Sequence, residues 1–174
     1  FGANFTFENI IMTVGAGSSI NVIMKTIFDP GDKQIVFAPY FVEYANWAGN
    51  YHAETVVVPP NEANGFEPDP EALKKALDPK VKAVIINNPN NPTGAIYSRE
   101  TLEQIAAVLK DAEKEYGHPI YIITDEPYRE LVYVDKEIVF IPDLYDNTII
   151  AYSWSKSLSI PGDRLGYLAV SPKS

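Results

Sequence analysis

Short apolar runs alternate with amphipathic stretches along the chain. The apolar runs have the length of strands, and they occupy residues 10–14, 34–38, 54–58, 81–86, 120–124, 148–152 and 165–170. The early runs are rich in β-branched residues and do not alternate with polar positions. We therefore expect strands that are buried on both faces, as in a largely parallel sheet.

The amphipathic stretches between these runs predict helices. We expect helices over residues 18–28, 42–49 and 98–116, and one that begins at residues 69–71. Because strands and helices alternate, the sequence predicts one α/β domain, a three-layer sandwich around a seven-stranded, mostly parallel sheet. In such folds ligands bind beyond the carboxyl ends of the strands.

The composition excludes several kinds of site. None of the 174 residues is Cys, which excludes disulfides, thiol catalysis and sulfur-based zinc sites. His52 and His118 are the only histidines and are far apart in sequence, so we expect no metal site. The net charge of −9 repels phosphate backbones, so nucleic acid is not an expected partner.

Other features bear on location and on the extent of the chain. No apolar run has membrane-spanning length, and there is no basic and then apolar leader, so we expect a cytoplasmic protein with no membrane partner. The chain does not begin with Met, and it ends directly after an apolar run. We therefore expect residues 1–174 to be a piece of a longer protein.

Polar or glycine-rich segments follow two of the predicted strands. Residues 15–18, Gly-Ala-Gly-Ser, lead into a helix and are equally compatible with a phosphate site and with a plain turn. Residues 87–94, Asn-Asn-Pro-Asn-Asn-Pro-Thr-Gly, form a turn that also offers several amide donors where an α/β protein binds its ligand.

Charged residues follow two further strands. Asp125 comes at the end of an apolar run, where desolvation raises the pKa of an acid, although a helix N-cap is the commoner role for a single Asp. Lys156 ends the segment Ser-Trp-Ser-Lys, and Arg164 follows eight residues later. Desolvation and a nearby cation would both favour a nucleophilic amine, whereas an isolated Lys would be a surface charge.

In this order, the segments at 87–94, 125–128 (Asp-Glu-Pro-Tyr) and 153–156, with Pro-Gly-Asp-Arg-Leu-Gly-Tyr at 161–167, are highly specific. Together they resemble the large, cofactor-binding domain of class I/II aminotransferases, the aspartate-aminotransferase-like proteins of fold type I. The resemblance covers essentially all of residues 1–174. It implies pyridoxal 5′-phosphate (PLP) as the cofactor and a sheet whose last strand is antiparallel.

The resemblance implies chemical roles for four side chains. Lys156 matches the lysine that binds PLP covalently and later moves a proton between the substrate Cα and C4′ of the cofactor. Asp125 matches the carboxylate that pairs with the pyridine nitrogen and keeps it protonated, so that the ring accepts electrons. Asn91 and Tyr128 match the donors to the phenolic oxygen of PLP.

The resemblance also implies contacts that hold the cofactor. Phe41 matches the aromatic ring that stacks on the pyridine, where many relatives carry Trp or Tyr. The phosphate cup is matched by two backbone positions and three side chains, namely Ala16, Gly17, Ser153, Ser155 and Arg164.

The implied activity is transfer of an amino group between an amino acid and a 2-oxo acid by a homodimer. In this family, the arginine that binds the substrate carboxylate lies in a C-terminal small domain, and an aromatic residue reaches in from the partner subunit. Both positions fall outside residues 1–174. Catalysis needs the substrate held accurately, so we expect this chain alone to be inactive and to bind PLP weakly or not at all.

Three other interpretations remain open. The first is another PLP-dependent activity on the same fold, such as a C–S β-lyase, a decarboxylase-like enzyme or an aminocyclopropane-forming enzyme. The second is a ligand-sensing domain of a regulator that carries a DNA-binding region elsewhere. The third is a folded but catalytically silent domain.

Overall fold

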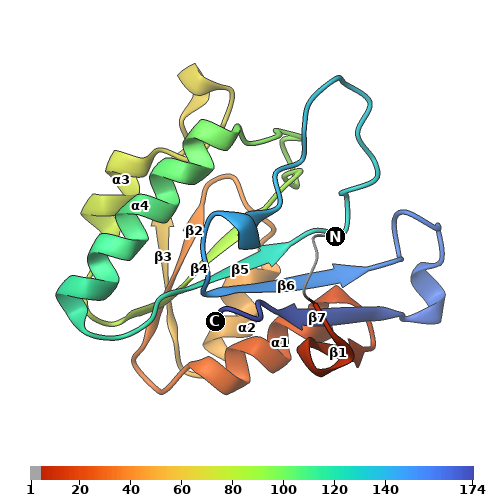
Figure 1. Cartoon of the computed structure of the whole chain (residues 1–174), viewed down its shortest axis with the longest axis horizontal. Helices are drawn as coiled ribbons and strands as arrows, with labels where there is room; N and C mark the ends of the chain where they lie inside the picture. Colours follow the sequence, from red (N-terminus) through yellow and green to blue (C-terminus); the bar gives the residue numbers. More distant parts are fainter. Residues whose placement is uncertain (1–4) are drawn as a thin grey trace.

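The computed structural model describes residues 5–174, which form a seven-stranded sheet with helices on both faces (Figure 1). The strands are β1 (Ile10–Thr13), β2 (Lys33–Phe37), β3 (Glu54–Val58), β4 (Val81–Asn87), β5 (Tyr121–Asp125), β6 (Thr148–Ser153) and β7 (Gly166–Val170). The α-helices are α1 (Ala16–Ile27), α2 (Glu43–Gly49), α3 (Pro70–Ala76) and α4 (Arg99–Tyr116). Short 3₁₀ turns are η1 (Phe7–Asn9), η2 (Glu62–Asn64), η3 (Ile141–Asp143) and η4 (Pro161–Asp163).

The strand order is β1-β7-β6-β5-β4-β2-β3. β7 runs antiparallel to both of its neighbours, β1 and β6, and the other pairs are parallel. The predicted mostly parallel sheet with an antiparallel last strand is thus confirmed. Since β1 and β6 both oppose β7, β1 points the same way as the parallel strands. The carboxyl ends of β1, β4, β5 and β6 therefore lie at the end of the sheet where β7 begins.

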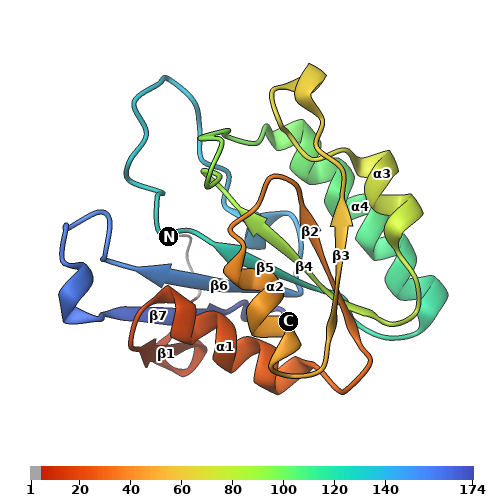
Figure 2. The same ribbon diagram turned by 180° about the vertical axis from the view of Figure 1, so that it is seen from behind.

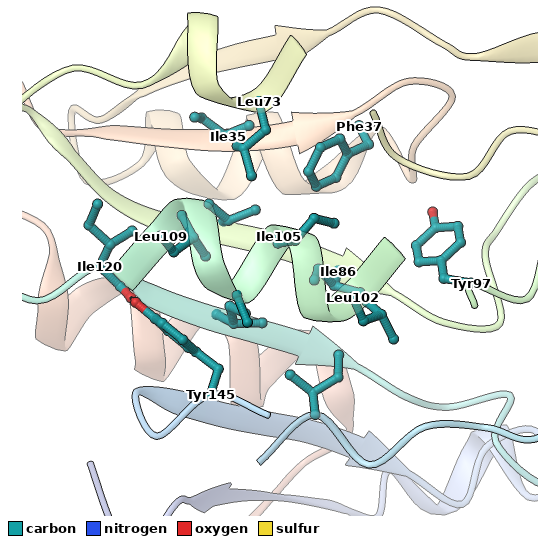
Figure 3. Packing of buried hydrophobic residues seen from close by; sticks show 14 of the residues in the cluster. Ile35, Phe37, Leu73, Ile86, Tyr97, Leu102, Ile105, Leu109, Ile120 and Tyr145 are labelled. Atoms are coloured by element: carbon teal, nitrogen blue, oxygen red, sulfur yellow. The ribbon is translucent and has the colours of Figure 1, made fainter. Parts of the chain in front are cut away.

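Helices cover the two faces of the sheet and complete three layers. α3 and α4 pack on one face, around buried residues such as Ile35, Leu73 and Ile105 (Figure 3). α1 and α2 pack on the other face, around Ile20 and Val36 (Figure 2). Ile35 and Val36 are neighbours in β2 and point to opposite layers, as the two-residue period of a strand requires. The consecutive apolar residues 35–37 of this strand thus reflect burial on both sides.

The ends of the helices follow from local hydrogen bonding. The side chain of Asp69 accepts hydrogen bonds from the backbone N–H groups of Glu71 and Ala72, at 2.9 and 3.3 Å, which confirms the predicted cap of α3. α1 begins at Ala16, earlier than predicted, because Gly15 turns the chain with a φ of 98°. Among the described helices, none is long and apolar enough to cross a membrane.

The first strand differs from its prediction. The apolar run at residues 10–14 indicates a buried strand, but β1 lies at one edge of the sheet and pairs only with β7. Ile11 is 54% exposed, Met12 58% and Val14 64%. An edge strand has no neighbour on its outer side, and the described residues do not cover this one. The apolar run therefore marks surface of this chain and not its core.

Candidate functional site

One cavity of about 340 Å³ opens where the strand ends converge. The ten positions predicted from the sequence all line it, namely Ala16, Gly17, Phe41, Asn91, Asp125, Tyr128, Ser153, Ser155, Lys156 and Arg164. The topology explains this convergence. Four of the segments follow the carboxyl ends of β1, β4, β5 and β6, and Arg164 lies just before β7, separated from it by Leu165, at the same end of the sheet. The roles of these residues toward a cofactor stay predictions.

Asp125 is the last residue of β5, and its carboxyl group is buried in the cavity wall. Its Oδ2 accepts a hydrogen bond of 2.6 Å from the hydroxyl of Tyr44, whereas its Oδ1 is buried without a hydrogen-bond partner. Burial raises the pKa of Asp125 to about 7; the Tyr44 bond opposes this rise and the charge of Glu126 adds to it. No helix follows β5 directly, so the alternative role as a helix N-cap is wrong.

Tyr44 is a member of the site that the sequence analysis missed. It lies in α2, is 1% exposed and lines the cavity beside Asp125. Phe41 and Trp47 lie three residues to either side, and all three rings contact one another edge-on, with centroids 5.6 to 6.1 Å apart. The helical spacing of these three aromatic residues is the signal that could have placed Tyr44 beside the predicted ring of Phe41.

Asn87, also missed as an individual residue, connects β4 to the other side of the cavity. Its amide donates to the carbonyl oxygen of Asp125 at 2.8 Å, and its own oxygen accepts from the backbone N–H of Asn91 at 2.6 Å. These two bonds fix the loop that carries Asn91.

Burial, together with the charge of Asp125, raises the pKa of Tyr128, and a hydrogen bond with Asn91 acts in the opposite direction. At neutral pH Tyr128 is therefore a neutral hydroxyl that can donate.

The opposite end of the cavity is suited to an anion. The N-terminus of α1 presents backbone N–H groups at Ala16 and Gly17, and both line the cavity. The guanidinium of Arg164 donates to the carbonyl oxygens of Pro161 and Val14 at 3.1 and 3.3 Å. These bonds hold a permanent cation beside the helix terminus, which favours binding of a phosphate dianion.

Lys156 lies in the turn after β6 and lines the same cavity. Its Nζ is 5.9 Å from the centroid of the Tyr128 ring. The side chain is exposed, so the expectation that burial desolvates this amine is wrong for the described chain. The turn is anchored from the next residue, because the hydroxyls of Ser157 and Tyr152 are 2.9 Å apart.

A larger cavity of about 470 Å³ adjoins the site and shares Asn91 and Tyr128 with it. Its other lining residues are mostly apolar, from the segments 89–96 and 131–134. No buried polar atom without a hydrogen-bond partner lines it among the described residues. The chemistry is therefore concentrated in the smaller cavity. In the part of the chain that the structure describes, no cluster of three metal-ligating side chains occurs either.

The residues present fit a flat heterocycle with a protonated ring nitrogen at one end and an anion at the other. The test is the Oδ1 atom of Asp125, because a buried acceptor without a partner is costly unless a ligand donor meets it. Arg164 and the N-terminus of α1 supply the groups for the anion, and Phe41 supplies a ring. PLP has this combination of features.

Comparison with known proteins identifies the family of the chain. Residues 2–174 match the family described as aminotransferase class I and II. An aspartate aminotransferase of Pyrococcus horikoshii is 36% identical over 169 residues, which cover 97% of this chain and 42% of that protein. An aspartate/prephenate aminotransferase of Thermus thermophilus is 36% identical over 177 residues, which cover 99% of this chain and 43% of that protein.

Solved structures give the same result. An amino transferase from Eubacterium rectale superimposes with a TM-score of 0.95 at 42% identity, over 99% of this chain and 43% of that one. The aspartate aminotransferase of Thermus thermophilus with maleate gives a TM-score of 0.89 at 34% identity, over 97% and 42%. The chain thus spans less than half the length of the relatives it matches.

Proposed function

The chain belongs to the class I and II aminotransferase family, and we propose that residues 1–174 form the PLP-binding large domain of a PLP-dependent aminotransferase. The observation that carries the proposal is the buried, unpartnered Oδ1 of Asp125 in a cavity that also holds Lys156 and Arg164. A carboxylate, an amine and an anion site in one cavity are the three groups that PLP chemistry requires.

When bound, PLP supplies an electron sink for the negative charge that develops at the substrate Cα. Asp125 would accept a hydrogen bond from the protonated ring nitrogen, and the positive charge there would stabilise the carboxylate against its tendency to protonate. Asn91 and Tyr128 would donate to the phenolic oxygen. Lys156 would hold the aldehyde end of the cofactor, and its amine is the group that would move the proton to and from the substrate Cα.

The remaining residues position the cofactor. Arg164 would bind the phosphate together with the backbone N–H groups of Ala16 and Gly17 and the hydroxyls of Ser153 and Ser155. The ring of Phe41 would pack on the heterocycle and help to exclude water from one face. Holding both ends of the cofactor would fix the reacting carbon relative to the Lys156 amine, and such positioning lowers the barrier to proton transfer.

We propose that the substrates are an amino acid and a 2-oxo acid and that the whole protein acts as a homodimer in the cytoplasm. The relatives named above are aspartate or aspartate/prephenate aminotransferases, so aspartate is the first donor to test. The exposed apolar residues of β1 support pairing of two copies, since an apolar edge strand is otherwise an aggregation hazard.

The test uses the whole protein loaded with PLP. ¹⁵N-labelled aspartate is supplied with 2-oxoglutarate, and the label in glutamate is measured by mass spectrometry, with labelled alanine as a second donor. We expect the label to move to glutamate and the movement to disappear in Lys156→Ala. Release of the label as ammonia from a donor with a sulfur leaving group, with no transfer from any amino acid, would support a β-lyase instead.

A further inference from the structure

A chain of buried hydrogen bonds extends from the core of the sheet to the cavity. Gln34 lies in β2 and is 0% exposed. Its Nε2 donates to the backbone carbonyl oxygen of Tyr44 at 2.8 Å and to Oγ1 of Thr55 at 2.8 Å. The hydroxyl of Tyr44 in turn donates to Oδ2 of Asp125 at 2.6 Å. Gln34 does not line the cavity, and its bond to Tyr44 is the route by which it can influence Asp125.

The bond from Tyr44 orients the carboxyl group of Asp125. A carboxylate has two equivalent oxygens, so a half-turn about its last bond restores the same arrangement, whereas a smaller rotation would break a short bond between two buried groups. With one oxygen held by Tyr44, the other is left without a partner. A donor that enters the cavity meets one acceptor in one direction.

Gln34 is placed where a polar side chain is costly. It points into the layer in which α1 and α2 pack, as its bond to the backbone of Tyr44 in α2 shows, and that layer is otherwise largely apolar. Its Oε1 is buried and has no hydrogen-bond partner, so this amide is only partly compensated for its burial. The hydrogen bond from the Gln34 amide to the Tyr44 carbonyl oxygen attaches α2 to the sheet. A helix of seven residues has little stability of its own and depends on such contacts for its position.

We propose that Gln34 and Tyr44 are positioning residues of the PLP site. Gln34 holds the first turn of α2 against β2, and Tyr44 holds the carboxylate of Asp125 so that Oδ1 faces the ring nitrogen of the cofactor. This inference rests on the proposed function and deepens it. It predicts that the effects of Gln34 on Asp125 pass through the Tyr44 hydroxyl, which a merely structural role of Gln34 would not require.

The first experiment needs no ligand. The titration of Asp125 is followed in the chain by ¹³C NMR of its carboxyl carbon. The groups around it are Tyr44 from α2, Glu126 and Tyr128 from the segment after β5, and Lys156 and Arg164 across the cavity. Tyr44→Phe removes the donor that favours the charged form, so we expect the titration midpoint to move to higher pH. Tyr145→Phe, which deletes an equally buried hydroxyl bonded to Ile120 on the opposite face of the sheet, should leave it unchanged.

The role of Gln34 is tested by the same titration. Gln34→Met keeps the length of the side chain, removes both bonds of the amide and should move the midpoint in the same direction as Tyr44→Phe. In the double variant, Gln34→Met should add nothing to Tyr44→Phe. Thr55→Val, which removes only the other acceptor of the amide, is the matched control. An unchanged midpoint in Gln34→Met, or full additivity in the double variant, would overturn the role of Gln34.

The second experiment measures ligand binding by the whole protein. PLP is compared with its carbocyclic analogue, in which C–H replaces the ring nitrogen. We expect Tyr44→Phe to weaken PLP binding about tenfold, the worth of one hydrogen bond to a charged group, and to change binding of the analogue much less. Equal losses for both ligands would contradict the positioning role. If the unaltered protein bound neither ligand, the proposed function would fail, while the NMR titration would still decide whether Gln34 and Tyr44 control Asp125.

Discussion

The guanidinium of Arg164 occupies the space that a side chain on Gly15 would need. A β-carbon added to Gly15 would lie 2.7 Å from Nη2 of Arg164, closer than such atoms approach in real proteins. Gly15 also has a φ of 98°, which other residues rarely adopt. The glycine therefore allows the turn before α1 and the cation before β7 to meet at the anion end of the cavity.

Replacement of Gly15 should have two effects: backbone strain that lowers stability, and displacement of Arg164 that weakens anion binding. We expect Gly15→Ala to lose about 1–3 kcal/mol of stability from strain and, in addition, to weaken PLP binding about tenfold because Arg164 must move. Gly65→Ala is the matched control, since Gly65 also has a positive φ but a β-carbon there meets no atom within 4 Å. Unfolding by urea and PLP titration of both variants separate the two effects. Equal PLP affinity in both would contradict the steric role of Gly15.

Lys156 should be the residue that binds PLP covalently. Borohydride reduction of the PLP-loaded protein, followed by peptide mass spectrometry, should locate the cofactor on Lys156, because that amine lines the cavity between Tyr128 and Arg164. Lys156→Ala should abolish the labelled peptide. Lys110→Ala should not, since Lys110 contacts the carbonyl oxygen of Leu144, away from the cavity. Labelling mainly at Lys74 or Lys110 would refute the assignment.

The buried carboxyl of Asp125 should make the chain without ligand less stable as pH rises. Its pKa is about 7 in the folded chain against an ordinary value of 3.8, so the folded state binds more protons between these two pH values. The free energy of unfolding therefore falls as pH increases from about 4 to 8, by a few kcal/mol. Burial also raises the pKa of Glu126, which acts in the same direction.

Urea unfolding at several pH values tests this linkage. Asp125→Asn should flatten the dependence, leaving the part due to Glu126. Asp111→Asn, at a carboxylate whose side chain is 80% exposed, should preserve the slope. The same slope in Asp125→Asn as in the unaltered chain would show that Asp125 does not contribute to it and would contradict the raised pKa.

In catalysis, the same carboxylate should affect the chemical step. We expect Asp125→Asn in the whole protein to slow proton removal from the substrate Cα by on the order of a hundredfold, because a neutral amide does not keep the ring nitrogen protonated. Binding of the phosphate end should change much less, since Arg164 and Ala16 are untouched. Single-turnover rates with Cα-deuterated substrate separate chemistry from binding. A change of only a few-fold in the proton-transfer rate would disprove the electron-sink role.

The site could be predicted from the sequence where chemistry follows a strand end. Asp125 stands directly after an apolar run, and Asn91 and Lys156 lie in the loops that follow two others. Parallel strands carry their following loops to the same end of a sheet. Tyr44 could not be found in this way, because it reaches the cavity from a helix whose position depends on the buried amide of Gln34. The contact between Gln34 in β2 and Tyr44 in α2 joins two different elements, and no local sequence pattern indicates it.

Burial was predicted less well than secondary structure. The run at residues 10–14 has the composition of a core strand, yet Ile11 and Met12 are exposed at a sheet edge. Tyr133, an aromatic residue in the loop after β5, is 90% exposed as well. The sequence shows that a side chain is apolar, but it does not show whether that side chain is covered by its own chain or by another molecule. The exposed amine of Lys156 belongs to the same class of error, since desolvation depends on what surrounds the turn after β6.

The exposed residues of β1 should drive self-association. Ile11 and Met12 are 54% and 58% exposed on one edge strand, so each leaves apolar surface in contact with water that a second copy can cover. We expect sedimentation velocity to show dimers of the chain that dissociate on dilution, and Ile11→Asp to shift the equilibrium toward monomer by at least about tenfold. Val57→Asp is the matched control, because Val57 is 45% exposed on β3, the opposite edge of the same sheet. If Val57→Asp dissociated the dimer and Ile11→Asp did not, the interface would lie at β3, and the proposed pairing through β1 would be wrong.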